Sequence, residues 1–413
     1  MRKKLLPTRT LAILLAGFVL DASAADQKRF IQDRFAIGLW VPPQTSAHLA
    51  DHYREIADAN FTLVIGTAAT NAAAQLKLCE KFGLQALVDS SGPVEKLPDS
   101  PACWGYLLVD EPGAGGFPDL ARRAADIRAH RPGRFGYINL LPNYAPAWAL
   151  GTKSYDEYVA QFINVVKPEV LSMDHYPVMR PNADTRDQYR ANLETFRKQA
   201  LAAGIPFWNF FYCMPFNDRL DPTEAQIRWQ INTSVAYGAK GVLYFCYWTP
   251  GKGAAGAGEF PKGGAIITAE GLPTRHYDEA RRINAELKNL GPTLMKLTST
   301  GTYYINPQTN TADVLAGSPL RKLSAIPGDP PANYLAGMFR QPDGGRAVIL
   351  VNDSYSQTGW LTVEFDAAAE SVQEVSKTTG KTVPITDDSP ELKGLQISLG
   401  AGDARLFLLP PRR

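Results

Sequence analysis

The stretch Trp104-Gly105-Tyr106-Leu107-Leu108-Val109-Asp110-Glu111-Pro112 ends an apolar run with two neighbouring acids. A continuous apolar run of this length is typical of a strand covered on both faces, as in a parallel sheet. Pro112 restricts the backbone of the residue before it to extended or turn conformations. The stretch therefore predicts a buried strand that carries Asp110 and Glu111 to its carboxyl end.

Seven further apolar runs alternate with amphipathic stretches on both sides of this one. The expected strands are 35–41, 61–66, 84–89, 104–109, 135–140, 170–176, 206–212 and 241–248, and the expected helices include 46–59, 72–82, 119–130, 155–166, 185–203, 222–237 and 277–290. Eight strand-helix units in about 250 residues match a closed (β/α)8 barrel. A doubly wound open sheet is less favoured, because Trp40-Val41-Pro42-Pro43 stands where that fold has a glycine-rich loop.

The pattern changes after the last helix to short strands separated by turn signals. The expected strands are 301–305, 334–340, 346–352, 359–365, 371–376, 395–399 and 404–409, with a hairpin turn at Asp343-Gly344-Gly345. We therefore predict a barrel over residues 25–297 and a small antiparallel sandwich over 298–413. The sandwich serves either as a structural cap or as a sugar-binding module.

The first 24 residues predict a cleavable secretory signal. Four basic residues precede the apolar run 11–20, and Ala22-Ser23-Ala24 supplies the small residues before a cleavage point. We expect the protein to be secreted or periplasmic. Removal of this segment leaves 39 basic and 40 acidic residues, so the mature chain is electrically balanced, which argues against a nucleic-acid partner.

Polar and aromatic residues stand where the expected strands end, which is where barrel enzymes place their active sites. Carboxylates and amides bind sugar hydroxyls while aromatic rings pack on sugar C–H faces, so the mixture favours an oligo- or polysaccharide substrate. The candidate residues are Trp40, Asp89, Asp110, Glu111, Asn139, Asp174, His175, Tyr176, Tyr212 and Trp248.

The Asp110-Glu111-Pro112 segment resembles the fourth-strand Asn-Glu-Pro of the retaining glycosidase clan that includes the cellulase-like and β-galactosidase-like barrels. Two further stretches are similar to that clan, 271–277 before the last helix and 399–408 in the closing strand of the accessory sandwich. The resemblance implies a glycoside hydrolase with Glu111 as the acid/base and Asp110 in the place of the Asn.

The chain departs from that clan at the end of the seventh strand, where 208–214 contains no acid. We therefore expect the second catalytic carboxylate to be Asp174, which resembles the sixth-strand acid of a different barrel clan. Asp218 and Glu259 are weaker candidates because nothing around them fixes their geometry. A non-catalytic sugar-binding barrel is the alternative reading, since a missing carboxylate could mean lost chemistry.

Three aromatic residues end strands that become neighbours once the barrel closes. We expect Trp40, Tyr212 and Trp248 to form one wall facing the acids. Cys213 and Cys246 end adjacent strands, so we expect them to lie close together and to be able to form a disulfide.

Motifs for other classes of site are missing from the sequence. No phosphate loop, catalytic triad or cofactor-lysine motif stands out, and the chain has five histidines. We therefore expect no cofactor and no metal. No run after the signal segment is apolar enough to span a membrane.

Overall fold

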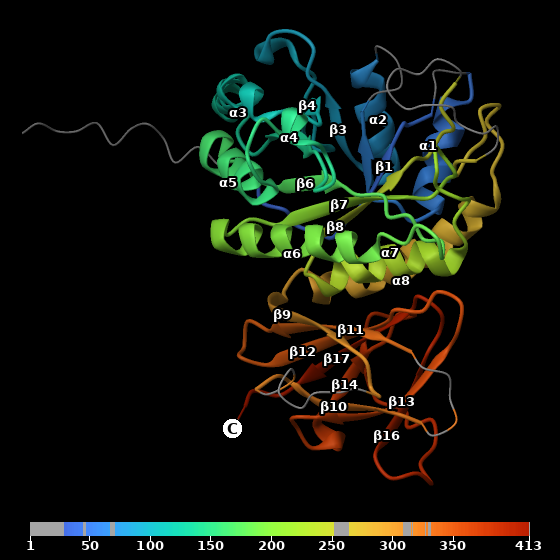
Figure 1. Cartoon of the computed structure of the whole chain (residues 1–413). Helices are drawn as coiled ribbons and strands as arrows, with labels where there is room; N and C mark the ends of the chain where they lie inside the picture. The colour runs from blue at the N-terminus through green and yellow to red at the C-terminus, as the bar shows by residue number, and fades with distance from the viewer. Residues whose placement is uncertain are drawn as a thin grey trace, which may run out of the picture.

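The computed structural model describes residues 29–43, 47–66, 71–251, 264–308, 315, 317–326, 328 and 332–412. Figure 1 shows two stacked parts, a barrel surrounded by helices and, below it, a β-sandwich in orange and red. The expected signal segment, residues 1–24, lies outside the described residues.

Eight parallel strands form a closed barrel in chain order. They are β1 (Ala36–Trp40), β2 (Leu63–Ile65), β3 (Gln85–Asp89), β4 (Cys103–Asp110), β5 (Phe135–Leu140), β6 (Leu171–Asp174), β7 (Phe207–Tyr212) and β8 (Gly241–Phe245). The barrel closes where β1 pairs with β8, with Ala36 opposite Gly241. The predicted (β/α)8 fold is confirmed.

Helices follow the strands and cover the outside of the barrel. They are α1 (Leu49–Asp58), α2 (Ala72–Phe82), α3 (Phe117–His130), α4 (Ala147–Leu150), α5 (Tyr155–Val166), α6 (Arg186–Ala203), α7 (Glu224–Ala236) and α8 (Arg275–Leu294). Side chains mark several of their ends. Thr223 and Gln226 form a reciprocal capping box at the start of α7, and Gly83 ends α2 at a φ of 70° that glycine adopts without strain.

Large side chains fill the amino-terminal half of the barrel. Trp104, Phe135, Tyr137 and Trp208 belong to one buried cluster inside the strands, and Trp208 Nε1 donates to Gln32 Oε1 at 3.0 Å. Because this end is plugged, space for a ligand remains at the carboxyl ends of the strands.

Two antiparallel sheets make the carboxyl-terminal sandwich, which confirms the predicted class. The six-stranded sheet has the order β15-β14-β17-β12-β11-β9 and the three-stranded sheet the order β10-β13-β16. Their bounds are β9 (Thr298–Ile305), β10 (Leu320–Ala325), β11 (Tyr334–Arg340), β12 (Arg346–Asn352), β13 (Gly359–Phe365), β14 (Gln373–Val375), β15 (Thr382–Pro384), β16 (Leu395–Leu399) and β17 (Ala404–Leu409).

Helix α7 packs directly on the six-stranded sheet. Figure 1 shows α6, α7 and α8 between the barrel strands and the sandwich. Gly337 on β11 lies so close to α7 that a Cβ there would stand 2.1 Å from the Ala236 carbonyl oxygen. Glycine at this position therefore permits the close approach of sheet and helix.

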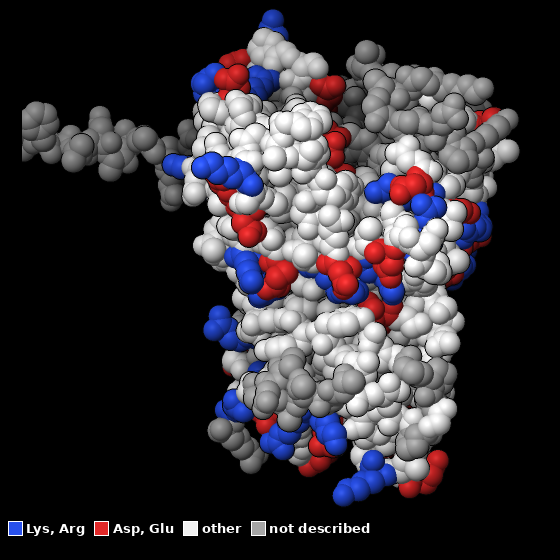
Figure 2. Space-filling view, in the orientation of Figure 1, with Lys and Arg blue, Asp and Glu red and all other residues white. Residues whose placement is uncertain are grey.

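Charges of both signs mix on the visible surface. Figure 2 shows blue and red side chains side by side in a band at the level of α6, α7 and α8. Ion pairs such as Arg228 with Glu224 and Arg228 with Glu286 belong to these helices. Among the described residues, no helix is both long enough and apolar enough to cross a membrane.

Candidate active site

A cavity of about 380 Å³ opens at the carboxyl ends of the barrel strands. Its position follows from the fold, because the opposite end of the barrel is filled. The lining residues are Trp40, Asp110, Glu111, Asn139, Asp174, Tyr176, Phe210, Phe216, Asn217 and Phe245. Six of the predicted site residues therefore meet in one place.

Strand β4 delivers two acids to this cavity. Asp110 is its last residue, and Glu111 follows with a φ of 50°, which is uncommon for a residue with a side chain. The Glu111 amide donates to the Asn139 carbonyl at 2.9 Å, and Tyr158 on α5 donates its hydroxyl to the Pro112 carbonyl at 2.7 Å. These two bonds fix the strained turn, as is common where strain serves a site.

Asn139 at the end of β5 joins two of the acids. Its Nδ2 donates to Asp110 Oδ1 at 3.1 Å and to Asp174 Oδ1 at 2.9 Å. Glu111 completes the group, because it lines the same cavity and its charge raises the pKa of Asp174.

The surroundings favour protonation of all three acids. Asp110 and Glu111 remain open to solvent, but the cavity walls remove part of their hydration and raise the pKa of each. Asp174 is 6% exposed. Burial, followed by the charges of Glu111 and Asp110, raises its pKa well above the usual range, while the hydrogen bond from Asn139 acts in the opposite direction. The cluster thus favours the protonated form more than an exposed carboxyl does.

Aromatic side chains enclose the acids. The ring of Trp40 meets Phe210 edge-on at 5.7 Å between centroids. Tyr176 lies 5.1 Å from Phe245 and 5.4 Å from Phe216. Carboxylates beneath an aromatic enclosure suit a ligand that has both hydroxyl groups and apolar faces.

The structure does not bring His175, Tyr212 or Trp248 to the cavity. Side chains alternate along a strand, so His175 points outward from β6 while Asp174 points inward. His175 is fully buried, with Nδ1 bonded to Asn192 Oδ1 on α6 at 2.9 Å. Burial lowers its pKa to about 4, which keeps the ring neutral.

The expected wall of Trp40, Tyr212 and Trp248 is replaced by a different one. Tyr212 is buried behind Phe216, with 6.0 Å between the ring centroids. Trp248 packs outward on His52 of α1 at 5.0 Å. Phe216 and Asn217 follow β7 by several residues, beyond the strand ends that sequence reasoning considered. Phe210 and Phe245 were missed although the inward alternation of their strands could have identified them.

Tyr144, in the loop after β5, is a further residue that the sequence did not single out. It is 41% exposed and its ring meets His175 edge-on at 5.0 Å. The charges of Asp174 and Glu111 contribute to raising the pKa of its hydroxyl, after burial. Tyr144 therefore lies within electrostatic reach of the acids, at the rim of the site.

The other expected acids stand apart from the cavity. Asp89 accepts from the Ser91 amide at 2.7 Å and caps its own turn. Asp218 is paired with Arg219 at 2.8 Å and does not line the cavity. Glu259 lies outside the described residues.

The four cysteines are buried and free. The predicted proximity of Cys213 and Cys246 is confirmed, since the Cys213 thiol donates to the Cys246 carbonyl at 3.3 Å. No disulfide joins them. Burial raises the pKa of both thiols and so keeps them protonated and unreactive.

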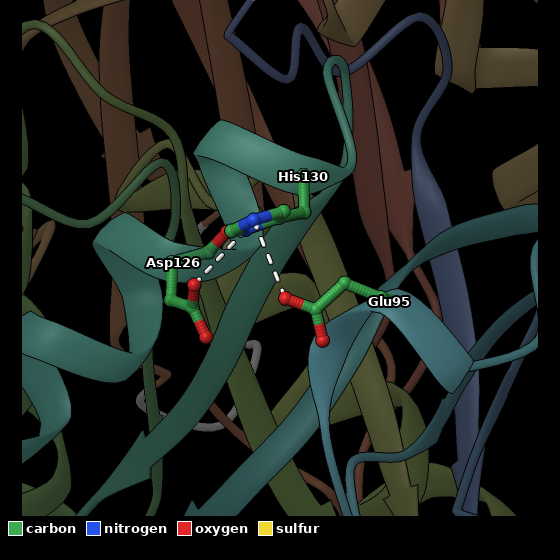
Figure 3. A group of neighbouring side chains, drawn as sticks. All are labelled: Glu95, Asp126 and His130. Atoms are coloured by element: carbon green, nitrogen blue, oxygen red, sulfur yellow. Dashed lines mark hydrogen bonds and ion pairs between the residues drawn. The ribbon is translucent and has the colours of Figure 1, made fainter.

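One group of possible metal ligands occurs among the described residues, away from the cavity. Figure 3 shows His130, the last residue of α3, between Asp126 and Glu95. Its Nδ1 lies 3.0 Å from Asp126 Oδ1 and its Nε2 lies 3.3 Å from Glu95 Oε1. Because each ring nitrogen faces a different carboxylate, the imidazole bridges Asp126 and Glu95.

A larger cavity of about 660 Å³ lies between the amino-terminal end of the barrel and the sandwich. Charged residues in its lining form ion pairs and hydrogen bonds within the protein. Glu169 pairs with Arg29 and Arg128, and Lys240 Nζ donates to the Leu297 carbonyl. Most of the remaining lining is apolar. Size alone therefore does not make it the active site, and the cavity lined by the three acids is the stronger candidate.

Comparison with known proteins identifies the fold but no family. No family model and no curated protein matches the chain. Among solved structures, a family 42 β-galactosidase from G. stearothermophilus aligns with a TM-score of 0.58 at 8% identity, over 91% of this chain and 98% of that chain. This likeness establishes a shared fold and leaves the chemistry to be argued from the site.

Two other solved structures align less well. A family 51 arabinofuranosidase from Xanthomonas axonopodis pv. citri gives a TM-score of 0.45 at 10% identity, over 91% of this chain and 96% of that chain. A β-galactosidase from Marinomonas ef1 gives 0.45 at 11% identity over 62% of this chain. The present chain spans 60% of the length of that β-galactosidase.

Proposed function

We propose that this protein is a glycoside hydrolase that cleaves O-glycosyl bonds of an oligo- or polysaccharide with Glu111 and Asp174. The observation that carries the proposal is the group of three carboxyls around Asn139, inside an aromatic cavity at the carboxyl ends of the barrel strands. Glycoside cleavage needs one carboxyl that holds a proton and one that carries charge. The raised pKa values of Glu111 and Asp174 support a proton held within this pair.

In the proposed reaction, Glu111 protonates the glycosidic oxygen as the bond to the anomeric carbon breaks. As this bond breaks, the Asp174 carboxylate either attacks the anomeric carbon, giving a glycosyl ester that water then cleaves with Glu111 as the base, or takes a proton from the water that attacks that carbon. Glu111 suits the first role because it stands at the open end of the cavity, where a leaving group can depart. Asp174 suits the second because Asn139 donates to its carboxylate.

The separation of the two carboxyls distinguishes a retaining mechanism from an inverting one. Retaining enzymes hold them about 5 Å apart, and inverting enzymes hold them at roughly 6.5–9.5 Å to leave room for water. Both carboxyls line one cavity, and the charge of Glu111 raises the pKa of Asp174, a proximity that favours the retaining mechanism.

Export is part of the same proposal. The pattern of residues 1–24 supports delivery to the periplasm or the medium. A polysaccharide too large to enter a cell is degraded in those places. Amino-terminal sequencing of the protein recovered from outside the cytoplasm tests this, and an amino terminus at Met1 would contradict it.

The test of the proposal is turnover of aryl glycosides and oligosaccharides by Glu111→Gln. We expect a loss of about 10²–10⁴-fold, largest for substrates with poor leaving groups, because proton donation is removed. Glu95→Gln, a matched change at an exposed acid away from the cavity, keeps full activity. Asp174→Asn loses activity too, and azide restores it if Asp174 is the nucleophile.

Two results contradict the proposal. Full activity of Glu111→Gln removes this residue from the mechanism. Sugar binding by the wild-type protein without turnover of any substrate identifies a non-catalytic sugar-binding barrel instead.

A further inference from the structure

A chain of buried hydroxyl groups continues behind Asn139. Ser172 Oγ donates to Asn139 Oδ1 at 3.1 Å, and the Tyr137 hydroxyl lies 2.8 Å from Ser172 Oγ. The three residues are at most 2% exposed. They come from neighbouring strands, with Asn139 on β5 opposite Ser172 on β6. The chain is thus built into the barrel wall.

The direction of these hydrogen bonds follows from the chemistry of the groups. Asn139 turns its NH₂ group toward Asp110 and Asp174, whose carboxylate oxygens accept. Its carbonyl oxygen then faces Ser172, whose single proton is used in donating to it. The Ser172 oxygen is left as an acceptor, so Tyr137 donates. The order Tyr137, Ser172, Asn139, carboxylate is therefore the consistent one.

We propose that Ser172 and Tyr137 are positioning residues that lock the Asn139 amide in this orientation, so that negative charge on Asp174 is stabilised when the proton is held by Glu111. An unlocked amide could rotate by half a turn and present its oxygen to the carboxylates. That orientation opposes charge on Asp174, which burial already disfavours. Ser172 and Tyr137 touch no reacting atom and act through Asn139.

The catalytic half of this inference rests on the proposed function, but the electrostatic half can be measured without any substrate. The Asp174 carboxyl is followed by ¹³C NMR of side-chain-labelled protein, and its signal is assigned by its absence in Asp174→Asn. In Ser172→Ala we expect the titration midpoint of Asp174 to rise by about half to one pH unit, the effect of weakening one hydrogen bond to a charged group.

Tyr137→Phe supplies a second variant that keeps the shape of the core. It leaves Ser172 free to rotate, so we expect a smaller rise in the same direction. The matched control is Tyr244→Phe on β8, which removes a buried hydroxyl that bonds Asn284 on α8 at 2.8 Å and does not line the cavity. Tyr244→Phe should leave the titration of Asp174 unchanged.

The pH profile of kcat/KM gives the catalytic readout. Loss of the lock should move the acidic limb of the profile to higher pH in Ser172→Ala, because Asp174 must be charged to act. A merely structural defect lowers the melting temperature and the height of the profile but does not move the limb. If Asp174 titrates as in the wild type in both folded variants, the inference is overturned.

The two proposals fail in different ways. A shifted Asp174 titration in a protein that cleaves no glycoside keeps the positioning role and removes the proposed function. Full glycosidase activity with an unmoved titration and an unmoved acidic limb keeps the function and removes the positioning role.

Discussion

Asp174 and His175 are adjacent in the chain, but their side chains lie on opposite sides of the barrel wall. Asp174 faces the cavity and accepts from Asn139, while His175 faces α6 and bonds Asn192. The alternation of β-strands separates them. Burial then acts on each in the direction of the neutral form, raising the pKa of the acid and lowering that of the imidazole.

Trp248 also faces outward and should contribute to stability rather than to sugar binding. It is 7% exposed and packs on His52 and Gly271. We expect Trp248→Ala to lower the free energy of unfolding by roughly 3–5 kcal/mol, as large-to-small core changes do, with sugar affinity unchanged. Urea unfolding and equilibrium binding measure the two quantities.

The matched control for this change is Trp148→Ala in α4. Trp148 is 85% exposed, so its loss should alter unfolding by at most about 0.5 kcal/mol. If Trp248→Ala is as stable as the wild type but binds sugar more weakly, Trp248 belongs to the sugar-binding site.

At the scale of elements, the stretch 271–277 that resembles a glycosidase motif has a structural role. Thr274 caps α8, and the next two residues bind the loop between β7 and α7. His276 is 2% exposed, with Nε2 at 2.8 Å from Asp221 and Nδ1 at 2.7 Å from Glu279. Arg275 also contacts both acids. The cluster fastens the loop that carries Phe216 and Asn217 into the cavity.

This cluster should make stability depend on pH. Hydrogen bonds to Asp221 and Glu279 outweigh burial and raise the pKa of His276, while bonds from His276 and Arg275 lower that of Asp221. The His276 contribution is therefore complete below about pH 6.5 and is lost as pH rises through the raised value. The Asp221 contribution is complete above about pH 4 and is lost as pH falls.

The measurement compares the unfolding free energy of the wild type with that of His276→Gln between pH 4 and pH 9. We expect the largest difference between about pH 4 and 6.5, declining on the alkaline side. The exposed His48→Gln should show a small difference at every pH. A His276 difference that is constant across the range would show that the charge on this ring contributes nothing.

The elements that sequence predicted well are those buried on both faces. Every barrel strand was located within a few residues, because a continuous apolar run of this length is typical of a strand covered on both faces. Two sandwich strands were missed. The β10 strand contains a register shift between Leu320 and Lys322 that breaks the alternation, and β15 is an exposed three-residue edge strand ending in Pro384.

The site was predictable where its residues end strands and unpredictable where it depends on orientation. Asp110, Glu111, Asn139 and Asp174 were found from the position of strand ends alone. The hydrogen-bonded order from Tyr137 through Ser172 was not, because it requires the register of β5 against β6. Phe216 and Asn217 reach the cavity from a loop that Arg275 and His276 bind through Asp221, and these contacts have no local signature in the sequence.

At the scale of the whole molecule, a buried aspartate joins the barrel to the sandwich. Asp353, after β12, is 4% exposed. Its Oδ1 accepts from Trp229 Nε1 on α7 at 2.9 Å and pairs with Arg190 on α6 at 3.0 Å, and its Oδ2 accepts from the Tyr304 hydroxyl at 3.0 Å. Both oxygens of the Asp353 carboxylate are therefore bound, one by side chains of the barrel helices and the other by a side chain of the sandwich.

Asp353→Ala should lower the stability of the whole molecule rather than that of the sandwich alone. The change leaves the Trp229 N–H without its acceptor and removes the buried partner of Arg190, which keeps only the exposed Asp187, and removing one partner of a buried ion pair costs roughly 3–5 kcal/mol. Calorimetry should show a lower melting temperature and, since α7 and the six-stranded sheet are then less firmly joined, separate transitions for barrel and sandwich.

Glu364→Ala, at an exposed position on β13, should melt like the wild type. Turnover below the first transition should be unchanged, because Asp353 lies outside the cavity. A single unshifted transition in Asp353→Ala would mean that apolar packing of α7 on the sheet joins the two parts without this carboxylate.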